Sequence, residues 1–224
     1  MVAVSAPIRP AIAFRSRFLR AKRVLDIAGV VLLLIPLSLV MAAVALAIRL
    51  DSPGPVFYRQ KRVGLDGVEF KMLKFRSMFV NNDDAIHRQA ISRFMSGEVL
   101  DESGKGPAYK LSGDPRITRV GRFIRKTSLD ELPQFINVLR GEMSLVGPRP
   151  PLAYEVALYR PHDLLRLAGK PGVTGPWQVY GRSRVTFDEM VDMDIAYLQR
   201  QSVLEDLKLI VLTVPVMLLG SGGE

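Results

Sequence analysis

The chain has 224 residues and carries 31 Lys and Arg against 22 Asp and Glu, which gives a formal net charge of +9. This length suits one compact domain with appendages. The absence of cysteine excludes a disulfide framework, a thiolate nucleophile and cysteine-based metal sites. The positive charge suits a nucleic acid, an anionic membrane surface or a phosphate-bearing substrate. Because the sequence contains no recognisable nucleic-acid-binding module, we expect no nucleic acid partner.

The first fifty residues predict a basic arm followed by a membrane helix. Residues 1–20 mix Ala, Pro, Ser and Arg, and we interpret them as a basic N-terminal arm. Residues 27–48 include no charged residue, and as a straight helix they would measure about 33 Å, enough to cross a bilayer. Pro36 lies in the middle of this run, where a proline kinks or breaks a helix. Basic residues flank both ends, so the positive-inside rule places both ends in the cytoplasm. A kinked span and a re-entrant helix broken at Pro36 both fit these features.

The next segment predicts a β-hairpin. Residues 56–62 and 68–76 are rich in β-forming side chains, and the Asp66-Gly67 pair between them is typical of a hairpin turn. Lys74 and Arg76 are two residues apart, so on a strand both side chains lie on one face. Such a face is either a solvated basic surface or a clamp for a diphosphate.

Residues 127–134, with the sequence Thr-Ser-Leu-Asp-Glu-Leu-Pro-Gln, predict the first turn of a helix that ends near Gly141. Ser128 and Glu131 have the spacing of a capping box. The first helical turn favours anions, so we expect Asp130 to be ionised. Acidic residues at such a position are most often only caps, but basic residues surround this pair: Arg116, Arg119, Arg122, Arg125 and Lys126 before it, and Arg149 after it. A carboxylate among arginines at a helix N-terminus predicts chemistry on a phosphate.

Further helices are expected over 82–95, 187–201 and 204–219. We expect the loop after the first of these to act as a lid. The second carries acidic residues at 188, 192 and 194, which we interpret as an exposed helix face rather than a metal site. The third is apolar, short and interrupted by proline, which favours a helix lying in the membrane interface. His87 and His162 form no zinc signature, and we interpret both as surface residues.

Two long runs of this sequence resemble the bacterial sugar transferases, the monotopic polyprenyl-phosphate phosphoglycosyl transferases. The runs are Arg125-Lys-Thr-Ser-Leu-Asp-Glu-Leu-Pro-Gln134 and Gly141-Glu-Met-Ser-Leu-Val-Gly-Pro-Arg-Pro150. The resemblance covers roughly residues 21–220 and includes four shorter motifs: Lys22-Arg23-x-x-Asp26, Gly54-Pro55-x-Phe57, Lys74-Phe-Arg-Ser-Met78 and Pro171-Gly-Val-Thr-Gly175. It implies that the membrane helix enters one leaflet and turns back at Pro36.

The resemblance also implies an enzyme that transfers a sugar 1-phosphate from a UDP-sugar to undecaprenyl phosphate and so initiates surface polysaccharide synthesis. Asp130 would be the nucleophile, forming a covalent intermediate and releasing UMP, and Glu131 would serve as metal partner or acid/base. A magnesium ion (Mg²⁺), held by both carboxylates, would be the cofactor. The residues implied in binding are Lys74, Arg76, Arg125 and Arg149 for the phosphates, with Gln134 and Arg182 in nucleotide-binding or supporting roles.

These features predict a mainly α fold with a small antiparallel β-hairpin. In it, a re-entrant membrane helix over 21–50 is attached to a compact cytoplasmic catalytic domain over 51–224. We expect the protein in the bacterial inner membrane, in contact with membrane lipids, and consider a homodimer as one assembly. Two alternatives stay open: a membrane glycosyltransferase that releases UDP, and a non-catalytic basic scaffold in polysaccharide assembly. The sequence does not name the sugar, although the Gly-Pro-Trp-Gln-Val run is a weak hint toward galactose or glucose.

Overall fold

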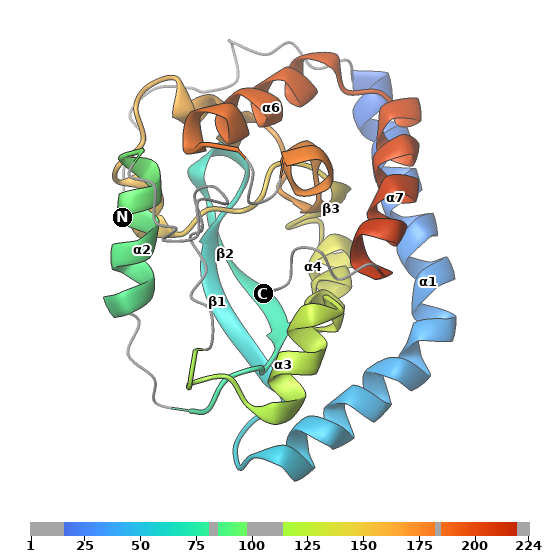
Figure 1. Ribbon diagram of the computed structural model, residues 1–224. Coiled ribbons are helices and arrows are strands. Elements are labelled where there is room, and N and C mark those ends of the chain that lie inside the picture. Colours follow the sequence, from blue (N-terminus) through green and yellow to red (C-terminus); the bar gives the residue numbers. More distant parts are fainter. Residues whose placement is uncertain (1–15, 81–84, 98–113, 182–184, 219–224) are drawn as a thin grey trace.

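The computed structural model describes residues 16–80, 85–97, 114–181 and 185–218. Most of the expected N-terminal arm, most of the expected lid loop and Arg182 lie outside these ranges. Helices dominate the described part, which also contains two small two-stranded sheets. Figure 1 shows the hairpin of β1 (Phe57–Val63) and β2 (Glu69–Phe75) running through the middle of the molecule. Helix α2 (Ala85–Met95) lies on one side of it, and α1 (Ser16–Asp51) and α7 (Val203–Leu218) lie on the other. The prediction of a mainly α fold with a small antiparallel hairpin is confirmed.

The long first helix, α1, runs from Ser16 to Asp51 and contains Pro36 without interruption. The prediction that the helix is interrupted at Pro36 is therefore wrong, whereas its re-entry into one leaflet stays a prediction. Figure 1 shows a bend along this helix instead. A proline removes one backbone N–H and crowds the preceding turn, which bends a helix axis without necessarily ending the helix. Just beside it, the Ser38 hydroxyl donates a hydrogen bond to the Ile35 carbonyl at 2.7 Å. By length and composition alone, α1 is able to cross a membrane.

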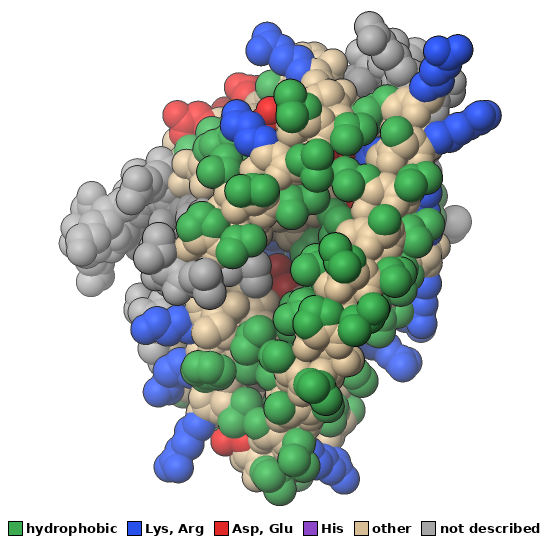
Figure 2. Space-filling model, turned by 90° about the vertical axis from the view of Figure 1, so that its right-hand side faces the viewer, with side chains coloured by type: hydrophobic (Ala, Val, Ile, Leu, Met, Phe, Trp, Pro, Cys, Tyr) green, Lys and Arg blue, Asp and Glu red, His purple; other side chains and the backbone are tan. Residues whose placement is uncertain are grey.

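An exposed aliphatic surface, which we call the α1/α7 surface, extends over α1 and the last helix, α7 (Val203–Leu218). The two helices contact each other, and Figure 2 shows hydrophobic side chains gathered over both. Its exposed members include Val31, Leu32, Ile35, Leu39 and Leu46 from α1, and Leu204, Leu207, Val211 and Val214 from α7. An apolar surface of this kind indicates contact with a membrane or another protein.

A buried polar cluster joins α1 to α7 and to α6 (Phe187–Arg200). The Lys22 ammonium lies 2.6 Å from a carboxylate oxygen of Asp206 and 3.2 Å from the hydroxyl of Tyr197, which also donates to Asp206. Four residues further along α1, Asp26 accepts hydrogen bonds from the hydroxyl of Ser144 and the backbone of Leu145, both in β3. Because all of these side chains are buried, their pairing fixes where the N-terminal half of α1 lies.

The predicted hairpin is confirmed. Strand β1 (Phe57–Val63) pairs antiparallel with β2 (Glu69–Phe75), and Phe57 lies opposite Phe75. The turn between the strands places Asp66 and Gly67 at φ values of 55° and 80°. Aspartate tolerates this left-handed conformation and glycine adopts it freely, which is why the pair marks the turn.

The remaining elements close the domain around the hairpin. They are α2 (Ala85–Met95), α3 (Arg119–Lys126), η3 (Leu129–Glu131), α4 (Gln134–Arg140), β3 (Ser144–Val146), α5 (Ala153–Val156), η4 (Asp163–Ala168), β4 (Gly172–Thr174) and η5 (Trp177–Gly181). Strands β3 and β4 pair in parallel. The main hydrophobic core joins side chains from α1, β2, α4, β3 and α7, among them Val30, Phe75, Val138, Val146 and Leu209. The short turn η3 contacts both β2 and α3, and these two elements restrict its position.

Candidate active site

The acidic pair Asp130 and Glu131 lies in the single turn η3 rather than in the first turn of an α-helix. The predicted capping box is wrong, because Ser128 has a left-handed backbone (φ 56°) and its side chain makes no capping hydrogen bond. The backbone N–H of Ser128 donates instead to the Arg125 carbonyl, so this residue closes the end of α3. Helix α4 begins only after Pro133.

Lys74 and Glu131 form the contact that joins the hairpin to the acidic turn. The Lys74 ammonium lies 2.7 Å from a carboxylate oxygen of Glu131, and both side chains are partly exposed. Asp130 precedes Glu131 on the same turn and is half-buried. The structure thus brings together three of the residues singled out in the sequence, two acids and one cation, although they are far apart along the chain.

Asn137, on α4, hydrogen-bonds to the backbone of β2 and fixes that strand relative to α4. Its side-chain oxygen accepts a hydrogen bond from the Leu73 backbone at 2.9 Å, and its amide donates to the Lys71 carbonyl at 2.9 Å and to the Glu142 carboxylate at 2.7 Å. The residue is fully buried. Because Leu73 adjoins Lys74, these bonds fix the part of β2 that carries Lys74 against α4. Sequence analysis gave Asn137 no role, because on the expected helix it falls on the polar face with Asp130 and Gln134.

Arg62, on the neighbouring strand β1, and Arg149 add further positive charge. Arg62 is buried on β1 and donates to the Pro150 carbonyl at 2.9 Å, next to Arg149. Burial and the nearby charge of Arg149 lower the pKa of Arg62 to about 10, while Glu155 and Glu131 act in the opposite direction. Arg62 therefore stays charged near neutral pH. Sequence analysis missed its role, since a buried arginine on an amphipathic strand looks like any other basic residue.

Arg76 does not take the predicted place beside Lys74. Its guanidinium is buried and donates to the carbonyl and hydroxyl of Ser52, at 2.7 and 2.9 Å, and to the Pro53 carbonyl at 3.0 Å. These acceptors lie at the end of α1, where the last carbonyls of a helix have no partner within the helix. The predicted clamp of two cations is thus wrong, and Arg76 holds the chain just after α1.

The other predicted site residues come from α3, α4 and the segment after β3, or lie outside the described ranges. Arg125 is half-buried in the last turn of α3, and α3 contacts η3. Gln134 is buried at the start of α4. Arg149 lies after β3, with its guanidinium 3.8 Å from the carboxylate of Glu155. Arg182 lies outside the described ranges.

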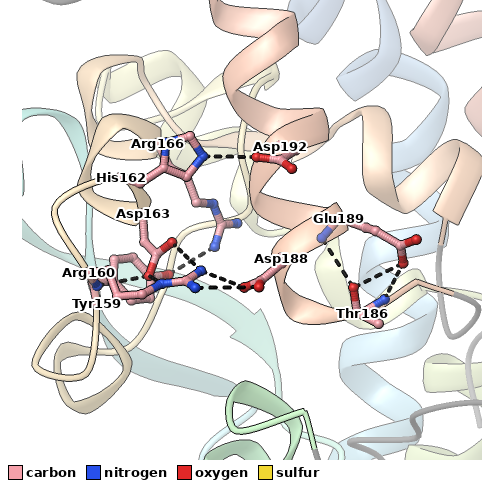
Figure 3. A network of polar contacts seen from close by, with 9 residues as sticks. All are labelled: Tyr159, Arg160, His162, Asp163, Arg166, Thr186, Asp188, Glu189 and Asp192. Carbon is pink, nitrogen blue, oxygen red and sulfur yellow. Dashed lines mark hydrogen bonds and ion pairs between the residues drawn. The ribbon is translucent and has the colours of Figure 1, made fainter.

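The acidic residues of α6 divide into two kinds. Asp188 and Asp192 are exposed, and they contact Arg160 at 2.5 Å and His162 at 2.9 Å, as Figure 3 shows. The interpretation as an exposed face is confirmed for these two. It is wrong for Asp194, which is fully buried and lies 2.6 Å from Arg166. Within the described ranges, no group of three or more His, Cys, Asp or Glu is placed to hold a metal ion.

The family profile described as "Bacterial sugar transferase" matches residues 16–220, nearly the whole chain. The chain belongs to this family. Similar curated proteins include the galactosyl transferase CpsE of Streptococcus agalactiae serotype III (strain NEM316), 43% identical over 212 residues that cover 94% of this chain and 45% of CpsE. The exopolysaccharide production protein ExoY of Sinorhizobium fredii (strain NBRC 101917 / NGR234) is 40% identical over 202 residues, 90% of this chain and 87% of ExoY.

A third relative of this bacterial sugar transferase carries a reaction in its name. The UDP-glucose:undecaprenyl-phosphate glucose-1-phosphate transferase of Escherichia coli (strain K12) is 42% identical over 201 residues, 86% of this chain and 39% of that protein. The chain thus spans less than half the length of CpsE and of the E. coli protein, and most of ExoY. Every residue of the site built above lies inside the segment that the family profile matches.

Proposed function

We propose that this sugar transferase moves a sugar 1-phosphate from a UDP-sugar to undecaprenyl phosphate and so initiates surface polysaccharide synthesis. The contact between Lys74 and Glu131 is the observation that carries the proposal, because it joins a cation to an acidic pair at the surface of a strongly basic chain. The reaction named for the E. coli relative supports the same substrates. A diphosphate donor and a lipid phosphate acceptor are both anionic, as such a site requires.

Positive charge in the site is supplied from three segments. Lys74 comes from β2, Arg62 from β1 and Arg149 from the turn after β3, and the charges of Arg149 and Glu131 both act on Arg62. Arg149 lies within the Gly-Pro-Arg-Pro run, where prolines fix the backbone and reduce the entropy lost when the arginine binds. A planar guanidinium matches two phosphate oxygens at once. Lys74 and Arg149, with Arg125 of α3, form our proposed diphosphate-binding surface, and the buried Arg62 contributes only its charge.

Asp130 is the proposed nucleophile. One of its carboxylate oxygens attacks the phosphorus next to the sugar, the bond from that phosphorus to the bridging oxygen breaks, and UMP leaves with the electron pair. An oxygen of the polyprenyl phosphate then attacks the same phosphorus, and the Asp130 carboxylate is released. No base is needed in either step, because both attacking oxygens are already ionised.

Glu131 and Lys74 support this chemistry from either side of the turn. Lys74 pairs with Glu131, and in our proposal it also binds donor phosphate oxygens. Its positive charge would then offset the repulsion between the Asp130 carboxylate and the donor diphosphate. The donor set fits a magnesium ion, since Mg²⁺ takes one or two carboxylates together with substrate phosphates and water. Asp130 and Glu131 would hold it, and it would supply further neutralisation of the diphosphate.

The α1/α7 surface is our proposed membrane contact. The exposed aliphatic side chains of both helices suit the acyl region of a leaflet, and the basic residues before Ile27 suit anionic head groups. We place the protein in the bacterial inner membrane with its catalytic domain in the cytoplasm, where nucleotide sugars are made. This location brings the site to the plane of the lipid phosphate.

The test is to trap the covalent intermediate. Enzyme is mixed with Mg²⁺ and a UDP-sugar labelled on the sugar, without polyprenyl phosphate, and quenched rapidly. We expect label on the protein in step with UMP release, and neither in Asp130→Asn, which keeps the side-chain shape but removes the nucleophile. Release of UDP instead would indicate a glycosyltransferase. An Asp130→Asn variant that supports normal polysaccharide synthesis would indicate a scaffold.

A further inference from the structure

Two cations meet where the N-terminal half of α1 passes the C-terminal end of α4. Arg23 of α1 donates hydrogen bonds to the carbonyls of Val138 at 2.5 Å and Leu139 at 2.8 Å. Lys170 reaches the same place from the segment just before β4. A Cβ added at Gly141 would lie 3.6 Å from the Lys170 ammonium and 3.7 Å from the Arg23 guanidinium, so both charges flank one point. We call Arg23 and Lys170 the basic pair.

Lys170 is the member of the basic pair that the fold itself does not explain. The residue is half-buried, and its ammonium has no hydrogen-bond or ion-pair partner among the described residues. The nearby acids are already engaged, Asp26 with β3 and Asp206 with Lys22. Burial and the charges of Arg23 and Lys22 lower the pKa of Lys170, while Asp26 acts in the opposite direction. An ammonium held beside other cations without a partner is costly, and an added anion would remove that cost.

The basic pair is separate from the proposed diphosphate-binding surface. Gly141 ends α4, whereas the turn that carries Asp130 and Glu131 precedes that helix. The seven residues of α4 advance the chain by about 10 Å, so the two places lie at opposite ends of the helix. A phosphate at the basic pair is therefore a different phosphate from the one that reacts.

Exposed apolar side chains adjoin the basic pair. Val24 and Ile27 follow Arg23 on α1, and Leu139 carries one of the carbonyls to which Arg23 donates; all three are exposed. Ile27 leads along α1 to Val31 and so to the α1/α7 surface. Figure 2 shows basic side chains bordering the upper end of that surface. Cations at the edge of an apolar surface match a ligand that has an anionic head and an apolar tail.

We propose that the basic pair binds the phosphate of an anionic phospholipid whose acyl chains lie along the α1/α7 surface. The Lys170 ammonium offers three N–H donors, and Arg23 keeps N–H groups that the carbonyls of α4 do not use. A phosphate between them accepts charge-assisted hydrogen bonds from both. The inference rests on the proposed membrane contact of this surface and is independent of the proposed reaction.

The alternative is a purely structural role, in which Lys170 stabilises the C-terminal end of α4 through the helix dipole. The two roles predict different results in a membrane that lacks anionic lipid. If Lys170 only stabilises α4, removal of its charge lowers stability in every membrane. If Lys170 binds a lipid phosphate, removal of its charge relieves the repulsion from Arg23 in a neutral membrane and lowers stability only where the anionic lipid is present.

The test compares melting temperatures in nanodiscs of phosphatidylcholine and in nanodiscs that also contain increasing amounts of phosphatidylglycerol. We expect phosphatidylglycerol to raise the melting temperature of the parent by roughly 5 °C, because a ligand that binds only the folded state stabilises it. Lys170→Gln should melt no lower than the parent in phosphatidylcholine and should lose most of this rise. Lys170→Arg keeps the charge and should retain most of it. Lys71→Gln, which removes an exposed charge from β2, is the matched control and should respond as the parent does.

Inorganic phosphate, added to phosphatidylcholine nanodiscs in the same molar amount, distinguishes a lipid from a free anion. It should not reproduce the rise, and an equal rise would overturn the lipid assignment. An equal loss of stability for Lys170→Gln in both kinds of nanodisc would assign Lys170 to α4 alone. An equal response to phosphatidylglycerol in Lys170→Gln and the parent would also overturn the proposal. If the chain enters neither nanodisc, the membrane contact fails and this inference with it, whatever the outcome for the proposed reaction.

Discussion

The ammonium of Lys74 lies 2.7 Å from the carboxylate of Glu131, and this contact joins strand β2 to the turn that carries Asp130. Neither partner is deeply buried, so the pair itself adds little to stability. The pair matters because its position is fixed. Asn137 holds the backbone next to Lys74 against the helix that follows Glu131. A weakly stabilising ion pair on a rigid support is an arrangement suited to holding an anionic substrate.

The first prediction is that Lys74 and Glu131 act as a unit. Lys74→Met and Glu131→Gln should each lower kcat/KM by tenfold or more, because each removes one partner and disturbs the other. The double variant should lose less than the product of the two single losses. Lys71→Met, an exposed change on the same strand, is the control and should retain activity. Strictly multiplicative losses would show that the two side chains act independently.

The second prediction separates two arginines that the sequence placed in one role. Arg149→Lys keeps the charge but loses the forked guanidinium, and should cost about 2–3 kcal/mol in transition-state binding. Arg76→Lys should lower the melting temperature while kcat/KM for the folded enzyme stays near the parent value, because Arg76 bonds the chain at the end of α1. Steady-state kinetics alongside thermal melts would measure both. If Arg76→Lys instead lowered kcat/KM without lowering the melting temperature, Arg76 would belong to the active site.

Local signals made most of the secondary structure predictable. The hairpin followed from the Asp66-Gly67 turn, and the helix over 187–201 from its hydrophobic period. The capping box failed although its spacing was right, because the end of α3 already determines the conformation of Ser128. A local motif is reliable only when no neighbouring element uses the same residue.

Side-chain roles that depend on distant partners were much harder to predict. Lys74 and Arg76 look equivalent on a strand, and only the tertiary fold shows that one meets Glu131 while the other meets the end of α1. Asp194 continues an acidic pattern along α6, yet Arg166 pairs with it inside the domain. In each of these cases the role of the side chain depends on a partner that is far away along the chain. A single sequence does not show which distant residues pair.

The third prediction concerns the buried cluster that holds α1 to α7. Asp206→Ala should destabilise the protein by about 3–5 kcal/mol, because it leaves the Lys22 ammonium buried without its carboxylate. Lys22→Met combined with Asp206→Leu should recover much of that loss, since no charge then remains buried. Thermal unfolding in detergent or nanodiscs would compare the variants. A double variant as unstable as Asp206→Ala would contradict a desolvation origin.

The fourth prediction is an acid-sensitive contribution to stability at the surface network of Figure 3. Asp163 accepts hydrogen bonds from the backbone and guanidinium of Arg160. Burial alone would raise the pKa of Asp163, but the bonds from Arg160 outweigh it and hold that pKa below its usual value of 3.8.

A depressed pKa for an acid means that the folded state prefers the ionised form. The contribution of Asp163 is therefore complete above about pH 4 and is lost as the pH falls through the lower folded value. Melting temperatures measured from pH 7 down to pH 3 should fall more steeply for the parent than for Asp163→Asn, which should be less stable at neutral pH. Parallel curves would contradict this origin.

The last prediction concerns topology, and it rests on where the two ends of α1 are fastened. Near the N-terminal end, Lys22 pairs with Asp206; at the C-terminal end, the Asp51 carboxylate accepts a hydrogen bond from the Val120 backbone at 3.1 Å. Both partners belong to the one compact domain. A straight helix of this length would measure about 54 Å and would carry its two ends to opposite sides of a bilayer. The bend in α1 lets both ends meet the same domain, so we expect both to face the cytoplasm.

Cysteines test this cleanly, because the chain has none of its own. Arg20→Cys and Leu50→Cys are suitable sites, since both side chains are exposed and neither makes the contacts that fasten α1. A membrane-impermeant maleimide should label neither cysteine in intact spheroplasts and should label both in inverted inner-membrane vesicles. Ile35→Cys, near the bend, should resist labelling from either side if it lies among acyl chains. Labelling of Arg20→Cys and Leu50→Cys from opposite sides would establish a kinked span, and the anchoring of both helix ends to one domain would then have to break in the membrane.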